Sequence, residues 1–303
     1  MLLLMCACTP AEKPAKEEPF GGATRTFDLT VDEGSYDLLM YNGMSMGRLD
    51  GYLINGQFLG PALVMDEGDT AEVTLHNATD KYVGLHPHGV HYEQDSEGMM
   101  QDSLAAPGGD YTYTWKATDG SGTFLYHSHQ LDSEMREYQA EAGVLGVIVI
   151  RGPDDPPYDY MLDYVMMNTY EAWTEIDPCA MGCDTGDTAA ATEDEEEEHT
   201  HTLVVQEVRD GVTDTQEDLR VSAKLGDEVR VNVVAFGEEF HTFHTHGYTW
   251  KDPYTGQLLD TRSLGPAESF LFPLELDNPG EWMIHCHVDS HIHMMSSWLD
   301  VEE

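Results

Sequence analysis

The chain has 303 residues, and 41% of them are hydrophobic, so it is long enough to build two domains that each bury a core. Its 57 acidic residues outnumber its 14 basic residues and give a formal net charge of −43. Such a surface repels nucleic acids and anionic membranes, because phosphate groups are bound by Lys and Arg. The composition therefore argues against nucleic-acid binding and favours cationic partners, although a solubility adaptation to a salty habitat has the same signature.

The first 24 residues have the order of a leader followed by a linker. The apolar run MLLLM precedes Ala7 and Cys8, and a stretch rich in Pro, Lys and Glu follows. This order is similar to a bacterial lipoprotein signal in which Cys8 carries the lipid, although the apolar run is short and no basic residue precedes it. We therefore expect export to the periplasm or outer surface, with Cys8 as the single link to a membrane. A frayed terminus without a role in export is the alternative.

Strand-like segments dominate the remaining chain. The segments AEVTLHN, GVLGVIVI and EVRVNVV alternate in polarity or are rich in β-branched residues, and Gly, Pro, Asn and Asp separate them. No long stretch has the 3.6-residue period of a helix. The sequence therefore predicts an all-β protein made of β-sandwiches.

The two halves of the sequence match each other at one fixed offset. Gly68 and Asp69 recur 158 positions later as Gly226 and Asp227, at the start of a strand in both halves. The same offset relates four His-x-His pairs, His86/His88 to His244/His246 and His127/His129 to His285/His287. Such a repeat indicates a duplicated domain. We expect sandwich domains at residues 25–152 and 201–303, joined by an acidic linker at residues 153–200.

The expected linker contains residues with metal-binding or redox chemistry. Cys179 and Cys183 flank a short loop and form a disulfide if the protein is exported, with metal binding as the alternative. The run Glu193–Glu198 is typical of a solvated, mobile segment. His199 and His201 follow it, and we interpret them as flexible linker histidines, with weak copper binding as the alternative.

The four His-x-His pairs predict metal binding. On a strand, residues i and i+2 face the same side, so each pair directs two imidazoles to one point. Eight imidazoles suit copper among the transition metals. A purely structural role would bury many ring nitrogens without partners, at a cost in free energy for each one.

Cys286 lies between two of these histidines. Strand alternation turns its thiol away from His285 and His287, so that one strand serves two metal sites. Two imidazoles and one thiolate are the ligand set of a blue-copper site. We expect Cys286 to share such a site with His291 and with His241, which comes just before the third histidine pair.

The motifs HPHG, HSH, HTFHTHG and HCHVDSH resemble the four signature motifs of multicopper oxidases and occur in the family's order. The resemblance covers both halves of the chain and implies two cupredoxin-like Greek-key β-sandwich domains with four copper ions per chain. By position, it assigns type 2 copper to His86 and His244, the type 3 pair to His88, His127, His129, His246, His285 and His287, and type 1 copper to His241, Cys286 and His291.

The axial position of the type 1 site departs from the family pattern. The family usually has Met ten residues after the Cys, where this chain has Ser296. A one-residue deletion aligns Met295 with that Met, so Met295 is the predicted axial ligand and Met294 is the reserve. Because the axial ligand tunes the copper potential, a site that neither Met reaches would have a shifted potential.

The repeat also indicates what the first half lacks. The positions equivalent to the type 1 ligands hold Ser128, Val83 and Ser133, so we expect no blue-copper site in the first domain. Each half contributes four of the eight predicted cluster ligands, which requires a first domain to meet a second domain. This division resembles the two-domain bacterial laccases, which are homotrimers with clusters between subunits, and it implies a homotrimer here.

The resemblance implies an enzyme that takes single electrons from a small reducing substrate at type 1 copper and reduces dioxygen to water at a trinuclear cluster. A phenolic, laccase-like donor is the default expectation, and oxidation of Cu(I), Fe(II) or Mn(II) is the alternative. By alignment with the family, Glu97 and Asp260 supply protons, and Tyr92 takes part in electron supply near the cluster. An exposed surface position is the alternative for each of these three residues.

Two other functions compete with this one. A copper nitrite reductase also has two such domains, but it needs only three His for its second copper and normally carries type 1 ligands in its first domain. The eight paired histidines and Ser128 therefore argue against it. A copper-carrying lipoprotein would use the Met pairs, Met99–Met100, Met166–Met167 and Met294–Met295. Such residues more often pack in cores, and a carrier does not need a Cys between cluster ligands.

Overall fold

A computed structural model provides the structure of the chain. It describes residues 20–39, 45–118, 120–133, 137–169, 200–216, 218–253 and 255–303. The predictions that lie outside these residues concern the leader with Cys8, the pair Cys179 and Cys183, the run Glu193–Glu198, and His199.

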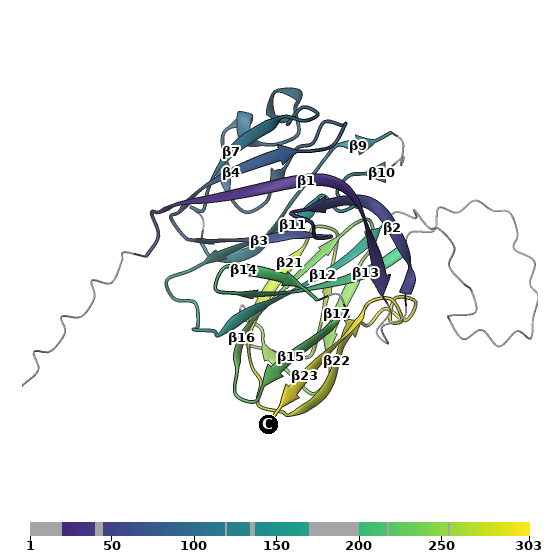
Figure 1. The fold of residues 1–303 in the computed structure, drawn as a ribbon. Helices are drawn as coiled ribbons and strands as arrows, with labels where there is room; N and C mark the ends of the chain where they lie inside the picture. The colour runs from purple at the N-terminus through teal and green to yellow at the C-terminus, as the bar shows by residue number, and fades with distance from the viewer. Residues whose placement is uncertain are drawn as a thin grey trace, which may run out of the picture.

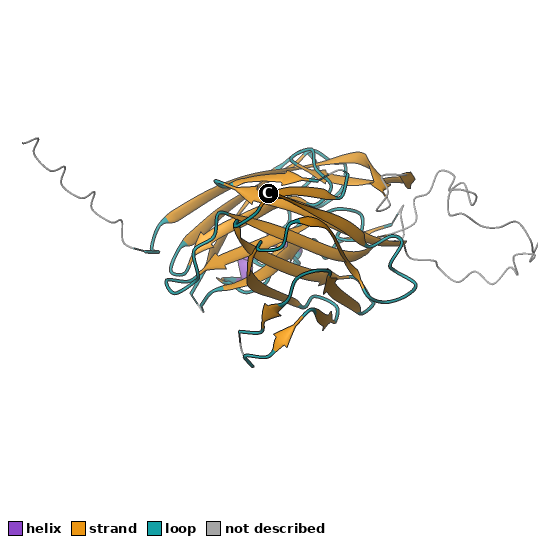
Figure 2. Ribbon diagram, turned by 90° about the horizontal axis from the view of Figure 1, so that it is seen from below, coloured by secondary structure: helices purple, strands orange, loops and turns teal. Residues whose placement is uncertain are grey.

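Strands are by far the main regular structure of the described chain, which confirms the all-β prediction (Figure 2, strands in orange). The first half contains β1 (Thr24–Leu39), β2 (Ser45–Ile54), β3 (Gly60–Asp66), β4 (Thr70–Asn77), β5 (His86–Pro87), β6 (His91–Tyr92), β7 (Asp110–Lys116), β8 (Gly122–His127), β9 (Leu131–Asp132), β10 (Glu137–Tyr138) and β11 (Leu145–Arg151). The second half contains β12 (Tyr160–Thr169), β13 (Thr200–Arg209), β14 (Val212–Thr215), β15 (Arg220–Lys224), β16 (Glu228–Phe236), β17 (His241–Thr245), β18 (Trp250–Lys251), β19 (Leu258–Leu259), β20 (Thr261–Leu264), β21 (Ser269–Glu275), β22 (Gly280–Cys286) and β23 (Ser296–Glu302). Two short 3-10 helices, η1 (Gln94–Ser96) and η2 (Gln101–Ser103), follow β6, and no helix in the described ranges is long and apolar enough to cross a bilayer.

Four large sheets form two sandwiches (Figure 1). The strand orders are β2-β1-β4-β7-β6 and β3-β11-β8-β5 in the first half, and β14-β13-β12-β16-β21 and β15-β23-β22-β17-β20 in the second. Each sandwich encloses its own apolar core, with Val73 and Trp115 buried in the first and Phe243 and Leu299 in the second. Strand β4 alternates buried and more exposed residues, because one of its faces packs on the core and the other faces solvent.

The two sandwiches stack through their inner sheets. Val147 and Val149 of β11 pack with Val165 and Met167 of β12 in a third apolar core. Both faces of these two strands are therefore covered, and their residues are buried almost throughout rather than in alternation. The third core holds the two halves of the chain together.

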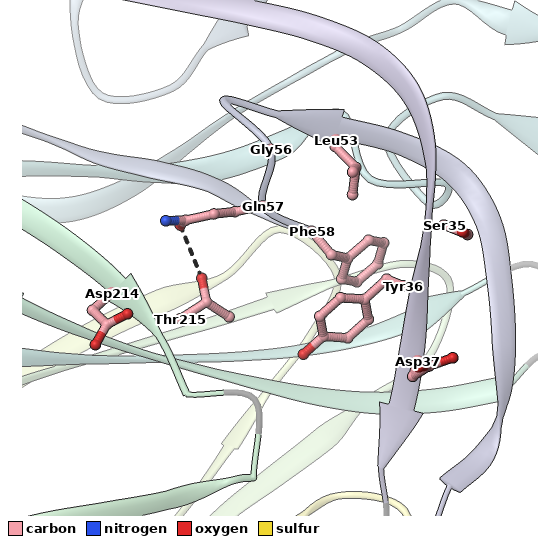
Figure 3. A pocket seen from close by; sticks show the side chains of 9 residues that line it. All are labelled: Ser35, Tyr36, Asp37, Leu53, Gly56, Gln57, Phe58, Asp214 and Thr215. Carbon is pink, nitrogen blue, oxygen red and sulfur yellow. Dashed lines mark hydrogen bonds between the residues drawn. The ribbon is translucent and has the colours of Figure 1, made fainter.

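A cavity of about 380 Å³ lies at the edge of this junction. Figure 3 shows Thr215 of β14 beside Gln57 of the first half, next to the stacked rings of Tyr36 and Phe58. The Thr215 hydroxyl donates to Oε1 of Gln57 at 3.0 Å, so a hydrogen bond joins the two halves across the cavity. None of the described residues that line it is a predicted copper ligand.

Strand β12 corrects the expected domain boundary, because the sequence places residues 160–169 in the linker. In the structure β12 is a central strand of a second-half sheet, where Tyr160 pairs with Val229 of β16 in parallel register. Strands β1 and β4 pair in the same parallel way, with Thr24 opposite Thr70. Strand β12 therefore begins the second sandwich. Its sequence, YMLDYVMM, gave no strand signal because a strand buried on both faces has no polar alternation.

A chain of polar side chains is buried between the halves. Asn232 donates from Nδ2 to Asp163 at 2.6 Å, and its Oδ1 accepts from the hydroxyl of Thr123 in β8 at 2.6 Å. Arg230 donates to the same Oδ1 at 3.1 Å. Loss of solvation raises the pKa of the fully buried Asp163 to about 7, although the bond from Asn232 and the charge of Arg230 act in the opposite direction. The junction thus contains a carboxyl group whose charged form is costly.

Replacing Asp163 with Asn should remove a pH-dependent loss of stability. An unfolded Asp titrates near pH 4, whereas folded Asp163 keeps its proton up to about pH 7. The stability that protonated Asp163 contributes to the fold is therefore fully present below about pH 4 and is lost as the pH rises through 7. We therefore expect the Tm of Asp163→Asn, relative to the Tm of the wild type, to be several degrees higher at pH 8 than at pH 5. One pKa unit corresponds to about 1.4 kcal/mol of stability, and each kcal/mol shifts Tm by about 2–4 °C.

Asp154→Asn is the matched control, because Asp154 is exposed and precedes β12 in the same connection between the halves. Its Tm difference from the wild type should not change with pH. Differential scanning calorimetry at pH 5 and pH 8 measures both variants. Parallel pH profiles for Asp163→Asn and the wild type would show that this carboxyl group does not control stability.

Candidate metal centres

The pairing of β17 with β22 brings two sets of predicted ligands together. The strands are antiparallel, with Phe243 opposite Cys286 and His244 opposite His285. Neighbouring residues on a strand face opposite sides, so Cys286 enters the apolar core that contains Phe243 while His285 faces the other way. One strand pair therefore supplies both a histidine site and a thiolate site.

Four histidines of the second half form a group that we call the second quartet. Neighbouring ring centroids lie 5.0–5.4 Å apart in this group, which consists of His244, His246, His285 and His287. Nε2 of His246 is 3.2 Å from Nε2 of His285. Two nitrogen ligands of the same tetrahedral metal ion, each about 2.0 Å from it, lie at a similar distance from each other.

The first half repeats this arrangement in β5 and β8. His86 lies opposite His127, and Nε2 of His88 is 3.2 Å from Nε2 of His127. Neighbouring ring centroids lie 4.4–5.7 Å apart in this first quartet, which consists of His86, His88, His127 and His129. The repeat in the sequence is thus also a repeat of strand register.

Main-chain carbonyl groups fix the orientation of several rings. In three rings Nδ1 lies within 2.9 Å of a main-chain carbonyl oxygen. His86 contacts the carbonyl of Glu97, His244 that of Asp260 and His285 that of Cys286. A ring that donates from Nδ1 carries its lone pair on Nε2, and metal-binding histidines are commonly held in this way. The residues of both quartets therefore fit copper.

Burial also lowers the pKa of several of these rings and so favours their neutral form. Loss of solvation lowers the pKa of His88 to about 4 and the pKa of His127 to about 3, and neighbouring histidines lower both further. Loss of solvation likewise lowers the pKa values of His129, His246 and His285. Neutral imidazole is the form that binds a metal ion.

The two quartets do not meet within one copy of the chain. Among the described residues, no ring contact or hydrogen bond joins a histidine of the first quartet to one of the second. The eight-histidine set predicted from the motifs is therefore not assembled by a single copy.

The thiolate site, in contrast, is assembled within the second half. The ligand atoms of His241, Cys286 and His291 lie within 4.8 Å of one another, and all three residues are buried. Cys286 Sγ is 3.6 Å from Nδ1 of His291 and accepts a hydrogen bond from the backbone N–H of Thr242 at 3.3 Å. The structure thus brings together the three residues that the sequence assigns to type 1 copper.

This site fits a soft cation. Neither ring nitrogen of His241 makes a hydrogen bond of normal geometry, although both are buried, and a bound metal ion would give one of them a partner. Burial raises the pKa of the Cys286 thiol, so its thiolate form needs a cation beside it. Copper bound by two imidazoles and one thiolate meets both needs.

The two candidate axial residues have different surroundings. The side chain of Met295 is fully buried in the same core as Cys286, and its carbonyl accepts from the N–H of Cys286 at 2.9 Å. Met294 is only partly buried and also packs on the core between the halves. These surroundings favour Met295 over Met294.

The first half offers no such ligand set among its described residues. Ser128 takes the place of the Cys, and its hydroxyl donates to Oε1 of Gln139 at 2.8 Å. Val83 is fully buried and apolar, and Ser133 is exposed. None of these side chains provides an imidazole or a thiolate.

Glu97 and Tyr92 lie beside the first quartet. The Tyr92 ring meets the His86 ring edge-on, with centroids 5.9 Å apart. Burial raises the pKa of Tyr92, and the charge of Glu97 raises it further. Oε1 of Glu97 is buried without a hydrogen-bond partner. Both residues are thus close enough to act on the quartet.

Asp260 lies beside the second quartet, but its carboxylate is not in direct contact with a histidine there. Its main-chain carbonyl meets Nδ1 of His244, while its carboxylate accepts from the hydroxyl of Thr261 at 3.0 Å. That hydroxyl is 2.8 Å from Nδ1 of His244. The Asp260 carboxylate therefore reaches the quartet through Thr261, at an exposed position.

Sequence reasoning missed two residues beside the thiolate site. His201, interpreted as a linker histidine, belongs to β13, and its ring stacks on the ring of His291 with centroids 3.7 Å apart. Oε2 of Glu239 is 3.3 Å from Nε2 of His291. The available signal for Glu239 was its place two residues before His241, which means little in a chain with 57 acidic residues. No motif marks His201.

Comparisons with known proteins agree with this geometry. Two sequence profiles described as Multicopper oxidase match residues 39–155 and 187–301. A probable nitrite reductase-hydroxylamine oxidoreductase fusion protein of Kuenenia stuttgartiensis is 26% identical over 80% of this chain and 27% of its own length. Copper resistance protein A of Pseudomonas syringae pv. tomato is 32% identical over 51% of this chain and 23% of its own length. Laccase-1 of Melanocarpus albomyces is 36% identical over 39% of this chain and 19% of its own length. The chain thus matches only about a quarter or less of the length of these relatives.

Solved structures share the fold. A crystal structure of a multicopper oxidase has a TM-score of 0.67 at 22% identity, covering 92% of this chain and 89% of the other. A copper nitrite reductase from Nitrosomonas europaea has a TM-score of 0.68 at 20% identity, covering 92% of this chain and 94% of the other. At these identities the likeness establishes the fold, two cupredoxin-like domains. With profile matches in both halves and the histidine and thiolate sites described above, the chain belongs to the multicopper oxidase family.

Proposed function

We propose that this chain is an oxidase that takes single electrons from a small donor at a type 1 copper site and uses them to reduce dioxygen to water at a trinuclear copper cluster. The observation that carries the proposal is the register of β17 and β22, which turns Cys286 into the core with Phe243 and sets His285 beside His244 on the other face. A phenolic donor is the starting expectation, and a laccase among the relatives supports it.

The proposal assigns four copper ions to each chain. In this proposal His241, Cys286 and His291 would hold the type 1 ion, and the buried thioether of Met295 would complete its ligand set. The other three ions belong to the eight histidines of the two quartets, with His86 and His244 at type 2 copper and the other six at the type 3 pair. Copper bound by these residues supplies reversible one-electron chemistry.

The chain itself supplies a short covalent route between the two kinds of site. His285 and His287 are the neighbours of Cys286, so only peptide units separate the thiolate from the cluster ligands. The His285 ring also donates from Nδ1 to the carbonyl of Cys286 at 2.8 Å, which adds a hydrogen-bonded route. The N–H of Thr242 donates to Sγ, and such bonds to the sulfur tune the potential of the site.

Proton supply is assigned to one carboxylate beside each quartet. Glu97 has a buried oxygen without a partner, so it can hold a proton or a water molecule directed at the first quartet. Asp260 reaches His244 through the hydroxyl of Thr261. Tyr92, with its ring against His86, is placed to supply an electron near the cluster.

The proposal requires two copies of the chain to build each cluster, because one copy does not bring its quartets into contact. A closed ring lets the first quartet of each copy meet the second quartet of the next. We propose a homotrimer, on the resemblance to two-domain laccases. Export and a lipid anchor at Cys8 stay predictions from the sequence.

Met295→Leu should raise the potential of the type 1 site, because loss of the thioether removes electron donation that favours Cu(II). Met294→Leu is the matched control, since Met294 is the adjacent residue and is less buried. It should leave the potential unchanged. Redox titration followed by the blue absorption measures both, and the reverse pattern would make Met294 the axial ligand.

A shared cluster should allow two inactive variants to complement each other. His88→Ala damages only the first quartet, and His285→Ala damages only the second. Each variant alone should fail to reduce dioxygen. Co-expression of the two variants in equal amounts should restore about a quarter of the wild-type activity. In a mixed ring, about one interface in four joins an intact first quartet to an intact second quartet. Mixed assemblies without oxygen uptake would contradict a cluster between copies.

Oxygen uptake by the copper-loaded protein tests the proposed function directly. Phenols, metal ions and nitrite are compared as substrates, with copper content measured on the same sample. Oxygen consumption with about four copper ions per chain supports the proposal. Nitrite turnover with about two copper ions would overturn it in favour of a nitrite reductase, whose fold the chain shares.

A further inference from the structure

A buried polar network in the first sandwich lies at the place that corresponds to the thiolate site of the second. Ser128 stands at the position equivalent to Cys286, and its hydroxyl donates to Oε1 of Gln139 at 2.8 Å. Gln139 also hydrogen-bonds the side chain of Tyr52. Tyr52 belongs to the same apolar core as Val83, another residue at a type 1 position. The first half therefore holds a buried phenol where the second half holds a thiol.

The phenol of Tyr52 faces a carboxylate. Its hydroxyl donates to Oδ2 of Asp132 at 2.5 Å, and both side chains are buried. The ammonium of Lys81 is 3.7 Å from the same oxygen and balances the buried charge. An amide in place of Asp132 would accept the same bond at a lower cost, since a buried charge is more costly than a buried neutral group. Packing alone thus does not require a carboxylate here.

A tyrosine beside a base gives up an electron more readily than one without a base, because a phenol that loses an electron becomes a strong acid. Burial raises the pKa of Tyr52, and Asp132 raises it further, so the resting phenol keeps its proton. That proton has to leave with the electron, and Asp132 is within hydrogen-bond reach to take it. Tyr126 is also fully buried, but its hydroxyl donates to the main-chain carbonyl of Pro61, which is no base.

The electron has a bonded route from Tyr52 to the first quartet. Hydrogen bonds lead through Gln139 to Ser128, whose two neighbours in the chain both belong to that quartet. The last step, from Ser128 to a neighbouring histidine, is the covalent step that links Cys286 to the second quartet. The proton moves only as far as Asp132, because a side-chain amide does not relay protons as a carboxyl group does. The network thus suits electron transfer with a local proton transfer.

We propose that Tyr52 is an internal one-electron donor to the first quartet and that Asp132 takes its proton. The inference rests on the proposed function, which supplies dioxygen at the quartet as the oxidant. The O–H bond of Tyr52 breaks, the proton joins the Asp132 carboxylate, and the electron leaves through Gln139 and Ser128. The phenol becomes a neutral phenoxyl radical and the carboxylate becomes a carboxylic acid. A later electron from the type 1 site restores the phenol, and Asp132 returns the proton.

Freeze-quench electron paramagnetic resonance tests this assignment. The copper-loaded protein is partly reduced and mixed with dioxygen, and an organic radical signal that changes when deuterated tyrosine is incorporated is expected. Tyr52→Phe should lose that signal. Asp132→Asn should lower it at least about tenfold, because the phenol stays in place without a base. Tyr126→Phe is the matched control and should keep the signal, since it removes the hydroxyl of a buried tyrosine without a carboxylate partner.

Two results would place the radical elsewhere or remove the role of the base. A signal that persists in Tyr52→Phe and disappears in Tyr92→Phe would overturn the assignment to Tyr52. Equal signals in Asp132→Asn and the wild type would overturn the role of the carboxylate, whereas a merely structural role for Asp132 predicts no change in the radical of a folded variant.

Photo-oxidation of the copper-free protein separates this inference from the proposed function. A photo-excited ruthenium complex with persulfate oxidises tyrosines without any copper, and the difference between the wild type and Tyr52→Phe measures the radical at Tyr52. That difference should fall at least about tenfold when both proteins also carry Asp132→Asn. A Tyr52 radical in a protein whose copper-loaded form takes up no oxygen would support the phenol–carboxylate pair and overturn the proposed function. Oxygen uptake with no Tyr52 radical in either experiment would overturn the inference alone.

Discussion

The antiparallel pairing of β17 with β22 is the constraint on which both kinds of metal centre depend. It sets Cys286 opposite Phe243 and His285 opposite His244, so the thiol enters the core while the imidazoles stay on the other side of the sheet. A slip of one residue would exchange these sides, because side chains alternate along a strand. The route from the thiolate to the cluster ligands is therefore a property of strand register, which a mobile loop would not preserve.

The two halves share this register and differ in what fills the core side. His86 lies opposite His127 in the first half, just as His244 lies opposite His285 in the second. At the position equivalent to Cys286, however, the first half has Ser128, which donates a hydrogen bond to Gln139. The apolar core between the inner sheets holds the halves together and leaves the quartets without contact. One copy thus brings together the three residues proposed for type 1 copper but keeps its two quartets apart, so the proposed trinuclear cluster requires assembly between copies.

The surroundings of His291 connect the proposed donor to this core. Burial lowers the pKa of His291, and the Glu239 carboxylate opposes that effect through charge and a hydrogen bond. The proposed type 1 site thus borders the acidic surface through Glu239, whose side chain is 47% exposed.

The sequence by itself determined the all-β class, the duplication and the identity of the clustered ligands, because strand alternation is a local rule that assigns His285 and Cys286 to opposite faces without knowledge of the fold. Only the tertiary structure decided that β12 opens the second sandwich, since a strand covered on both faces has no alternation to detect. It also decided that His201 reaches His291, because that contact depends on the register of β12 and β13, in which Asn168 lies opposite His201. Contacts between distant segments follow from packing, which no local pattern in the chain specifies.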